Sequence, residues 1–199
     1  MRNKILILLL LPVILFTIAY QWFVHVNYRF TAVTPNKLYK SALIAPDKLE
    51  KYLLEHKIKT VVDLIEVGKQ KFVDAEIKAI DEINKKNNLH INHVHIISKQ
   101  VPSKANLLTY YNLLDDVKNY PVLVHCYHGL GRTELYVALY KVEYENLSPL
   151  EARNETRFIV QSPIYKSSFA DVKPKGKFMI NYKPRNLGKD STLNSMNEE

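Results

Sequence analysis

The chain of 199 residues contains a single cysteine. One cysteine excludes a framework of intrachain disulfides and any metal site built from several cysteines. The sequence also lacks an arginine-rich run, an alternation of aromatic and basic residues, and the spacing of a zinc finger, so nucleic acid is an unlikely partner. Acidic residues are few beside basic ones, 20 against 28. The formal charge of +8 favours anionic partners, or reflects no more than a solvated lysine-rich surface.

Charged residues are absent from positions 5–24, which follow Arg2 and Lys4. A helix of about 20 apolar residues can cross the hydrocarbon core of a bilayer, and Tyr20 and Trp22 suit the head-group level. A cleaved signal peptide is the alternative, although bulky residues occupy the place of a small-residue cleavage site. We therefore expect a single-pass transmembrane helix at residues 1–24. Because basic residues precede it, the domain should lie on the exported, periplasmic or extracytoplasmic, side.

The remainder divides into an expected linker at 25–35, one folded domain at 36–182 and a mobile polar tail at 183–199. Apolar strand-like runs alternate with amphipathic segments, which predicts an α/β fold with a mostly parallel central sheet and helices on both faces. Val73, Ile77 and Ile80 should face inward from one helix, and Ser148 should cap another. The expected strands are 58–65, 89–97 and 121–125, and the expected helices include those starting near 46 and 148, and 103–119 and 133–145.

The cysteine lies in the segment 125–133, which reads His-Cys-Tyr-His-Gly-Leu-Gly-Arg-Thr. In α/β sheets, ligands bind beyond the carboxyl ends of strands, and this segment follows such an end. Successive N–H groups of the loop, with the N-terminus of the next helix, should form a nest for an anion. Arg132 can hold two oxygens of a phosphoryl group in its planar fork, and its charge favours the nucleophilic thiolate of Cys126.

The other residues of this segment have supporting roles. Gly129 and Gly131 allow turns that side chains would obstruct. We expect Thr133 to donate a hydrogen bond to the sulfur and His125 to order the loop from behind. The residues expected to bind phosphate or substrate are Tyr127, His128, Gly129, Leu130, Gly131 and Arg132.

His-Cys-x5-Arg-Thr after a strand resembles the active-site signature of the cysteine-dependent protein tyrosine and dual-specificity phosphatases. The segments 38–42, 58–64 and 147–152 are similar to parts of the compact bacterial, dual-specificity-like members, so the resemblance covers roughly 38–160. It implies a protein tyrosine phosphatase-like fold and the hydrolysis of phosphomonoesters through a phosphocysteine on Cys126. It also implies that Arg132 and the loop amides bind phosphate, and that no metal or other cofactor takes part. The implied substrate is a phosphorylated protein, phosphotyrosine by default, or a small, lipid or glycan phosphomonoester.

Three positions depart from the family pattern. The segment 96–102, where a mobile loop should supply an acidic proton donor, contains no carboxylate. Such a donor contributes roughly 10²–10⁴-fold to a rate. Asp63 is the candidate substitute for it, and the alternative is that Asp63 only caps or pairs locally. Glu134 replaces the usual glycine after Arg-Thr, where it could repel phosphate, point away or act as the acid. Gly131 stands where related loops often have an aspartate just before the arginine.

Two other functions stay open on the sequence alone. A catalytically poor, phosphate-binding pseudophosphatase would keep the loop without an effective acid. A rhodanese-like sulfurtransferase also begins its loop with cysteine after a strand, but often closes it with arginine one residue earlier. A pair among His90, His93 and His95 could bind a metal, yet this segment contains no cysteine or carboxylate to complete the set, and we expect no metal site.

Overall fold

A five-stranded sheet forms the centre of the domain in the computed structural model, which describes residues 2–185, with side chains from residue 10. Its spatial order is β1-β2-β5-β3-β4, with β1 antiparallel to β2 and every other pair parallel. The predicted α/β fold with a mostly parallel sheet is thus confirmed. The strands are β1 (Thr31–Thr34), β2 (Leu38–Ala42), β3 (Thr60–Asp63), β4 (Asn92–His95) and β5 (Val122–Cys126).

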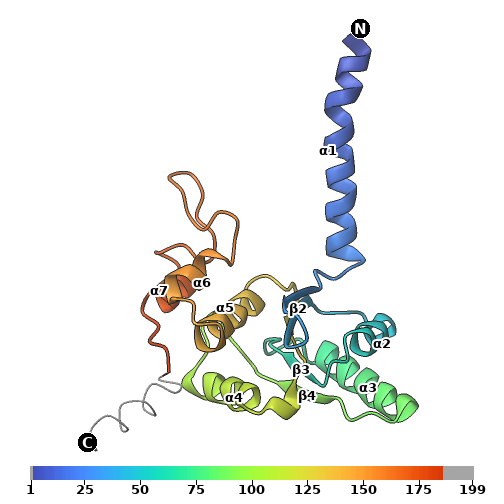
Figure 1. Cartoon of the computed structure of the whole chain (residues 1–199), viewed down its shortest axis with the longest axis vertical. Coiled ribbons are helices and arrows are strands. Elements are labelled where there is room, and N and C mark those ends of the chain that lie inside the picture. The colour runs from blue at the N-terminus through green and yellow to red at the C-terminus, as the bar shows by residue number, and fades with distance from the viewer. Residues whose placement is uncertain (1, 186–199) are drawn as a thin grey trace, which may run out of the picture.

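Helices cover both faces of this sheet (Figure 1). Alternate residues of a strand point to opposite faces, so neighbouring residues enter different cores. Val61 and Leu123 belong to the core beneath α2 (Pro46–Glu55) and α3 (Gln70–Asn87). Their neighbours Val62 and Val124 belong to the larger core on the other face. That core is covered by α4 (Lys104–Asp115), α5 (Arg132–Tyr144), α6 (Pro149–Asn154) and α7 (Pro174–Ile180), with the short 3-10 helix η1 (Val117–Asn119) after α4.

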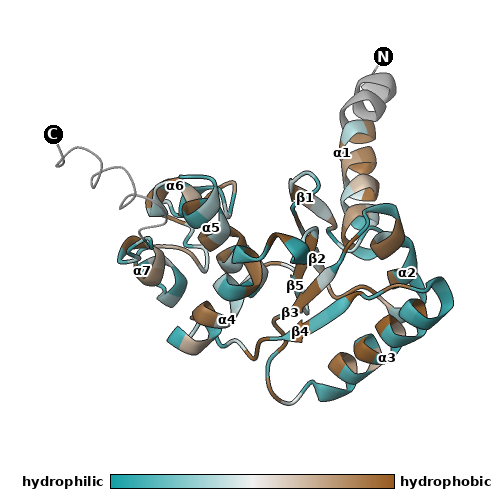
Figure 2. Ribbon diagram, turned by 60° about the horizontal axis from the view of Figure 1, so that its bottom comes forward, coloured by the Kyte–Doolittle hydropathy of each residue, from teal (hydrophilic) through white to brown (hydrophobic). Residues whose placement is uncertain are grey.

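Hydropathy matches this layered arrangement. Figure 2 shows apolar residues along β3 and β5 in the middle of the sheet, whereas β4 at the edge is polar. Every residue of β3 and β5 is buried, as expected for central parallel strands covered on both faces.

The predicted start of α6 is confirmed, since Ser148 accepts a hydrogen bond from Glu151 N, and the Glu151 side chain accepts one from Ser148 N.

Three elements differ from the sequence prediction. β1 lies inside the predicted linker, because a strand of four residues at an edge needs little apolar sequence when β2 supplies the hydrogen bonds. α7 arises in a polar segment where no helix was expected. On α3, Val73 and Ile80 are buried as predicted, whereas Ile77 is 37% exposed and Glu76 is buried in its place.

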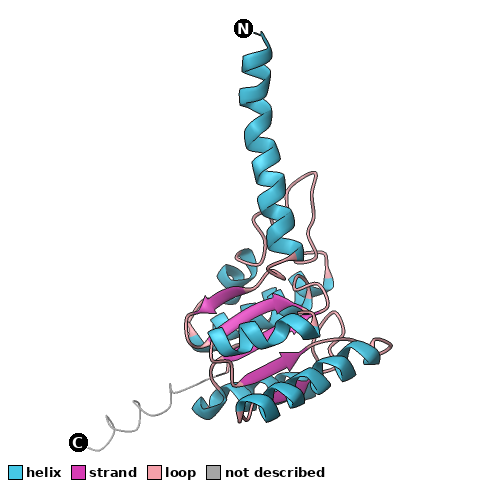
Figure 3. Cartoon of the chain, turned by 90° about the vertical axis from the view of Figure 1, so that its right-hand side faces the viewer, coloured by secondary structure: helices cyan, strands magenta, loops and turns pink. Residues whose placement is uncertain are grey.

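The N-terminal helix α1 (Arg2–His25) extends away from the domain (Figure 3). In the part of the chain that the structure describes, no helix combines the length and the apolar character that a membrane span requires. The predicted transmembrane anchor, and with it the membrane localisation with an exported domain, is therefore wrong.

The predicted domain limits at 25–35, 36–182 and 183–199 remain predictions. Most of the expected tail, residues 186–199, lies outside the described residues. At its beginning, Arg185 forms ion pairs with Glu143 and Asp115 of the domain.

Candidate active site

The single cysteine lies at the carboxyl edge of the sheet. Cys126 is the last residue of β5, with Ala42 of β2 in register beside it, while the preceding His125 is in register with Asp63 of β3. The loop 127–131 then leads into α5 at Arg132. The structure thus places the predicted loop at the edge where α/β sheets bind ligands.

The carbonyl groups of this loop point away from its centre. Because C=O and the following N–H point in opposite directions in a trans peptide, the N–H groups of His128, Gly129 and Gly131 face inward. In the described part of the chain, residues 129–131 donate no backbone hydrogen bond to protein, so their N–H groups are free for an anion. The outward bonds are Leu43 N to Tyr127 O at 3.4 Å, Arg29 Nη1 to His128 O at 3.1 Å, and Arg157 Nη2 to Leu130 O at 2.7 Å.

Gly129 is required by the geometry of the loop. Its φ is +66°, and a Cβ there would lie 2.6 Å from Ala42 N and 2.7 Å from Ser41 O. Both atoms belong to the backbone of β2 and cannot move aside alone. The glycine therefore allows the loop to lie directly on the end of the sheet.

The thiol of Cys126 is buried and polarised. Burial raises its pKa, but hydrogen bonds from the Thr133 hydroxyl and N–H, the charge of Arg132 and the His128 N–H outweigh burial and lower the pKa below its ordinary value. The Thr133 hydroxyl has no nitrogen or oxygen partner in the described chain, which leaves it to the sulfur. Thr133 thus occupies the place predicted for it.

Arg132 is held by the carbonyl groups of two neighbouring loops. Its Nη1 donates to Leu64 O at 2.7 Å and to Ser98 O at 3.4 Å, which follow β3 and β4. Its Nη2 lies 3.7 Å from Glu66 Oε1, on a side chain that is about half exposed. These bonds fix the guanidinium plane at the base of the loop and leave further N–H groups for a phosphoryl oxygen.

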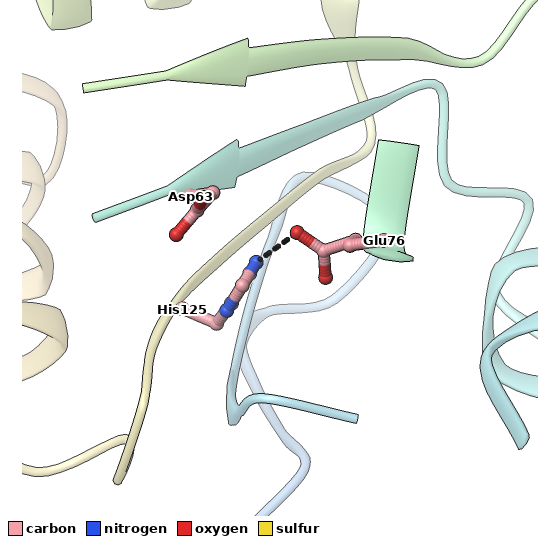
Figure 4. Close-up of side chains that lie close together, drawn as sticks. All are labelled: Asp63, Glu76 and His125. Carbon is pink, nitrogen blue, oxygen red and sulfur yellow. Dashed lines mark hydrogen bonds and ion pairs between the residues drawn. The ribbon is translucent and has the colours of Figure 1, made fainter. Parts of the chain in front are cut away.

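Behind the loop, a buried carboxylate from α3 pairs with the histidine that precedes the cysteine (Figure 4). Glu76 Oε2 lies 3.1 Å from His125 Nε2 and 3.0 Å from His93 Nε2. Although burial raises the pKa of Glu76, the two histidines lower it to about 2. Burial lowers the pKa of His125, but Glu76 and Asp63 raise it to about 9. His125 is therefore a cation behind the loop, consistent with its predicted ordering role.

Sequence reasoning missed Glu76. The available signal was a carboxylate on the apolar face of a helix, one turn from Val73 and Ile80. Asp63, Glu76 and His125 each offer a ligand atom, and these atoms lie within 4.8 Å of one another. The hydrogen bonds and charge balance of the cluster already satisfy the two carboxylates, so we describe it as an ion-pair cluster.

Asp63 does not reach the open side of the loop. Its side chain is fully buried, Oδ1 accepts a hydrogen bond from Ile65 N at 2.7 Å, and Oδ2 lies 2.8 Å from His95 Nδ1. Both carboxylate oxygens are thus occupied beneath the loop. This placement suits the local-pairing alternative and separates Asp63 from a leaving group.

Glu134 also points away from the loop. Lys40 Nζ of β2 donates to its two oxygens at 2.9 and 3.0 Å. The carboxylate is therefore neutralised on the far side of the first turn of α5. Its position removes the expected repulsion with a bound phosphate.

The rim of the loop is aromatic and basic. The Tyr127 ring lies edge-on to Phe72 at 5.2 Å between centroids, and Lys69 Nζ lies 4.0 Å from its centre. An open groove runs from this rim over the start of α2, lined among others by Ile44, Pro46, Phe72, Tyr127 and His128. Tyr127 and the exposed His128 thus lie where the organic part of a ligand would leave the loop.

One protein family matches this chain. Residues 35–170, more than half of the chain, match the family described as "DSP-PTPase phosphatase fused to NAD+ Kinase". A comparison with curated proteins finds no match.

Solved structures share the fold at low sequence identity. The crystal structure of P. aeruginosa TpbA is 19% identical, covers 79% of this chain and 86% of its own, and superposes with a TM-score of 0.56. The core catalytic domain of the PP-IP phosphatase SIW14 from S. cerevisiae is 17% identical, covers 84% of this chain and 89% of its own, and has a TM-score of 0.53.

Proposed function

The chain belongs to the family of DSP-PTPase phosphatases fused to NAD+ kinase, and we propose that its Cys126–Arg132 loop hydrolyses phosphomonoesters through a covalent phosphocysteine. The resemblance to cysteine-dependent tyrosine and dual-specificity phosphatases is confirmed, as is the phosphatase function that it implied. The two alternatives, a pseudophosphatase module and a sulfurtransferase, are not favoured by this match.

The Cys126 thiol and the N–H groups that face it support the assignment of roles within the loop. Cys126 has a thiol of lowered pKa at the end of β5, facing N–H groups that find no partner in the described chain. A thiolate is the nucleophilic form of cysteine, and inward N–H groups stabilise the oxygens of a phosphoryl group. Arg132 adds a bidentate donor whose plane is fixed by Leu64 O and Ser98 O.

The reaction has two displacements at phosphorus. In the first, Cys126 Sγ forms a bond to phosphorus while the bond to the leaving oxygen breaks, and this oxygen takes up a proton. In the second, water attacks phosphorus, the S–P bond breaks and inorganic phosphate leaves. Thr133 stabilises the departing thiolate by its hydroxyl, as it does in the resting site. His125, held by Glu76, orders the loop in both steps.

The rim favours an aryl phosphomonoester such as phosphotyrosine. Tyr127, Phe72 and the groove beyond them offer aromatic contact to a ring whose phosphate lies in the loop. Lys69 adds a positive charge above Tyr127. SIW14 is described as a PP-IP phosphatase, and at 17% identity it informs the fold alone.

Hydrolysis of p-nitrophenyl phosphate by the full chain tests this proposal. We expect Cys126→Ser to lower kcat by about 10³-fold or more, because the nucleophile is lost. Arg132→Lys should cost about 10²-fold, since it keeps the charge but loses the planar fork. Glu134→Gln is the matched control in the same turn, and should stay within about threefold of the wild type because Lys40 holds Glu134 away from the loop. Equal rates for the wild type and Cys126→Ser would reject the proposal.

A further inference from the structure

A buried lysine lies against the loop from a part of the chain outside the family match. Lys175 of α7 is 5% exposed, and its Nζ donates a hydrogen bond to Gln100 Oε1 at 3.0 Å. Among residues 10–185, no carboxylate lies within ion-pair distance of this ammonium. A buried ammonium without a counterion is unfavourable, which indicates that an anionic group approaches it in the working enzyme.

The position of Lys175 relative to Gly131 is informative. A Cβ built on Gly131 would lie 3.6 Å from Lys175 Cε and 3.8 Å from Nζ, so the ammonium occupies the space in front of this residue. Gly131 stands just before Arg132, where related loops often have an aspartate. The Lys175 ammonium, which carries protons, thus lies beside the position that an aspartate side chain would occupy at residue 131.

The acids expected from the sequence do not occupy this space. Asp63 is buried beneath the loop with His95, and Glu134 is held by Lys40. The segment 96–102 has no carboxylate and instead supplies Gln100, the partner of Lys175. The site therefore orients an ammonium where a carboxylic acid was expected.

We propose that Lys175 is the catalytic residue that donates a proton to the leaving oxygen of the substrate. This proposal rests on the proposed phosphatase function. As Cys126 Sγ bonds to phosphorus and the P–O bond breaks, a proton passes from Lys175 Nζ to the leaving oxygen, and the lysine becomes a neutral amine. In the second step the amine takes a proton from the attacking water, which restores the ammonium and the thiolate.

The electrostatic surroundings support proton donation. Burial, followed by the charges of Arg132 and Arg157, lowers the pKa of Lys175, while the Cys126 sulfur acts in the opposite direction. A lower pKa makes the ammonium a stronger acid and its amine easier to form. Arg132, fixed at the base of the loop, neutralises the phosphoryl group that Lys175 would otherwise bind alone.

The packing of α7 keeps this lysine in place. Gly176 lies so close to the preceding turn that a Cβ would be 2.0 Å from Ala170 O and 2.5 Å from Phe169 O. Arg153 Nε of α6 donates to Phe169 O at 2.7 Å and ties that turn to the domain. The backbone beside Lys175 is therefore packed against a turn that is itself held to the domain.

Leaving-group dependence tests the proposal directly. The full-length wild type, Lys175→Met and Lys175→Gln would be compared on aryl phosphates whose phenols span a range of pKa. We expect kcat of both variants to fall about 10²-fold for the most basic phenols and to change little for p-nitrophenol, which leaves without protonation. Lys177→Met, on the exposed side of the same helix, is the matched control and should behave as the wild type.

The alternative outcomes are distinct. An equal loss of kcat for every phenol would make Lys175 a phosphate ligand and overturn its role as acid. A dependence of kcat on the phenol pKa that is unchanged from the wild type would also overturn this role. If Glu66→Gln, not Lys175→Met, steepened the dependence, the exposed carboxylate near Arg132 would be the acid. Urea unfolding of each variant separates misfolding from lost chemistry. Absence of any Cys126-dependent hydrolysis in the wild type would instead reject the proposed function itself.

Discussion

At the scale of single residues, the chemistry of the loop is set by the neighbours of Cys126. The thiol is buried, which by itself would raise its pKa and leave it inert. Thr133, which donates through its hydroxyl and its N–H, has the largest effect in the opposite direction, and Arg132 follows. The reactivity of the cysteine therefore depends on the first turn of α5 more than on the strand that precedes it.

Thr133→Val should raise the pKa of the Cys126 thiol. The substitution keeps the shape of the side chain and the N–H of residue 133 but removes the hydroxyl. The rate of alkylation by iodoacetamide, measured against pH, gives the thiol pKa of each protein. We expect the midpoint of the variant to lie above that of the wild type, and coincident midpoints would show that the hydroxyl does not act on the sulfur.

Gly129→Ala should damage the loop, whereas Gly68→Ala should not. Both glycines have positive φ, +66° and +91°, so alanine is strained at either position, and more so at Gly68. Only at Gly129 would the new Cβ meet backbone atoms of β2, while nothing lies within 4 Å of the Cβ at Gly68. We expect Gly129→Ala to lower kcat/KM by about 10²-fold or more, because the N–H groups would be displaced. Equal activities of the two variants would contradict the close contact with β2.

At the scale of elements, three adjacent strands and one helix build the support behind the loop. The registers place His95, Asp63 and His125 in one row across β4, β3 and β5. α3 lays Glu76 over this row, where it bonds to His125 and His93. The loop is thereby connected to α3 through charge as well as through the sheet.

This ion pair has a defined effect on stability against pH. The pKa of His125 is raised from 6.5 to about 9, so its contribution is fully present below pH 6.5 and is lost as pH rises through 9. The pKa of Glu76 is lowered from 4.5 to about 2, so its contribution is present above pH 4.5 and is lost as pH falls towards 2. The pair therefore stabilises the fold most between pH 4.5 and pH 6.5.

Glu76→Gln should destabilise the protein at neutral pH by roughly 3–5 kcal/mol, because His125 would lose its counterion. The measurement is urea unfolding at several pH values in a Cys126→Ser background, which removes the titration of the thiol. With Glu76 present, stability should fall between pH 6.5 and 9, and the added Glu76→Gln substitution should abolish this fall. Glu82→Gln, on the exposed side of α3, is the control. Parallel pH profiles with and without Glu76→Gln would contradict the ion pair.

At the scale of the whole molecule, the C-terminal segment lies against the loop. After α6, the chain leads to α7, which packs against α6 and brings Lys175 beside Gly131. Beyond α7, Tyr182 donates to the buried carboxylate of Glu143, and Arg185 pairs with Glu143 and Asp115. The segment after residue 170 is thus bound to the domain over its described length.

Gly176→Ala tests this coupling between the C-terminal segment and the loop. The new Cβ would overlap Ala170 O, so α7 must shift, at a cost of about 1–3 kcal/mol in stability. We expect activity to fall mainly for phosphates with basic phenols, as in Lys175→Met. Ile180→Ala, at the exposed end of α7, should leave activity unchanged. If Gly176→Ala lost stability but kept its full activity on basic phenols, α7 would have no part in the reaction.

The parts of this account that local sequence determines were predictable, and those that depend on distant contacts were not. The loop 125–133 was identified because strand, nucleophile, glycines and arginine are consecutive. The position of Lys175 could not be predicted because it depends on Gly131, a distant residue in the sequence. β1 could not be predicted because its four residues are exposed or only partly buried and take their hydrogen bonds from β2. The direction of the Glu134 side chain depends on Lys40, 94 positions earlier, and could not be predicted from the residues around it.

Trapping the covalent intermediate is the most direct test of the central claim, that Cys126 attacks phosphorus. The full-length protein would be mixed rapidly with p-nitrophenyl phosphate, quenched and digested, and the peptides analysed by mass spectrometry. We expect a phosphoryl group on the sulfur of the peptide containing Cys126, formed as fast as p-nitrophenol is released and absent from Cys126→Ser. Release of p-nitrophenol by the wild type with no phosphocysteine at any time, or at an equal rate by Cys126→Ser, would contradict it.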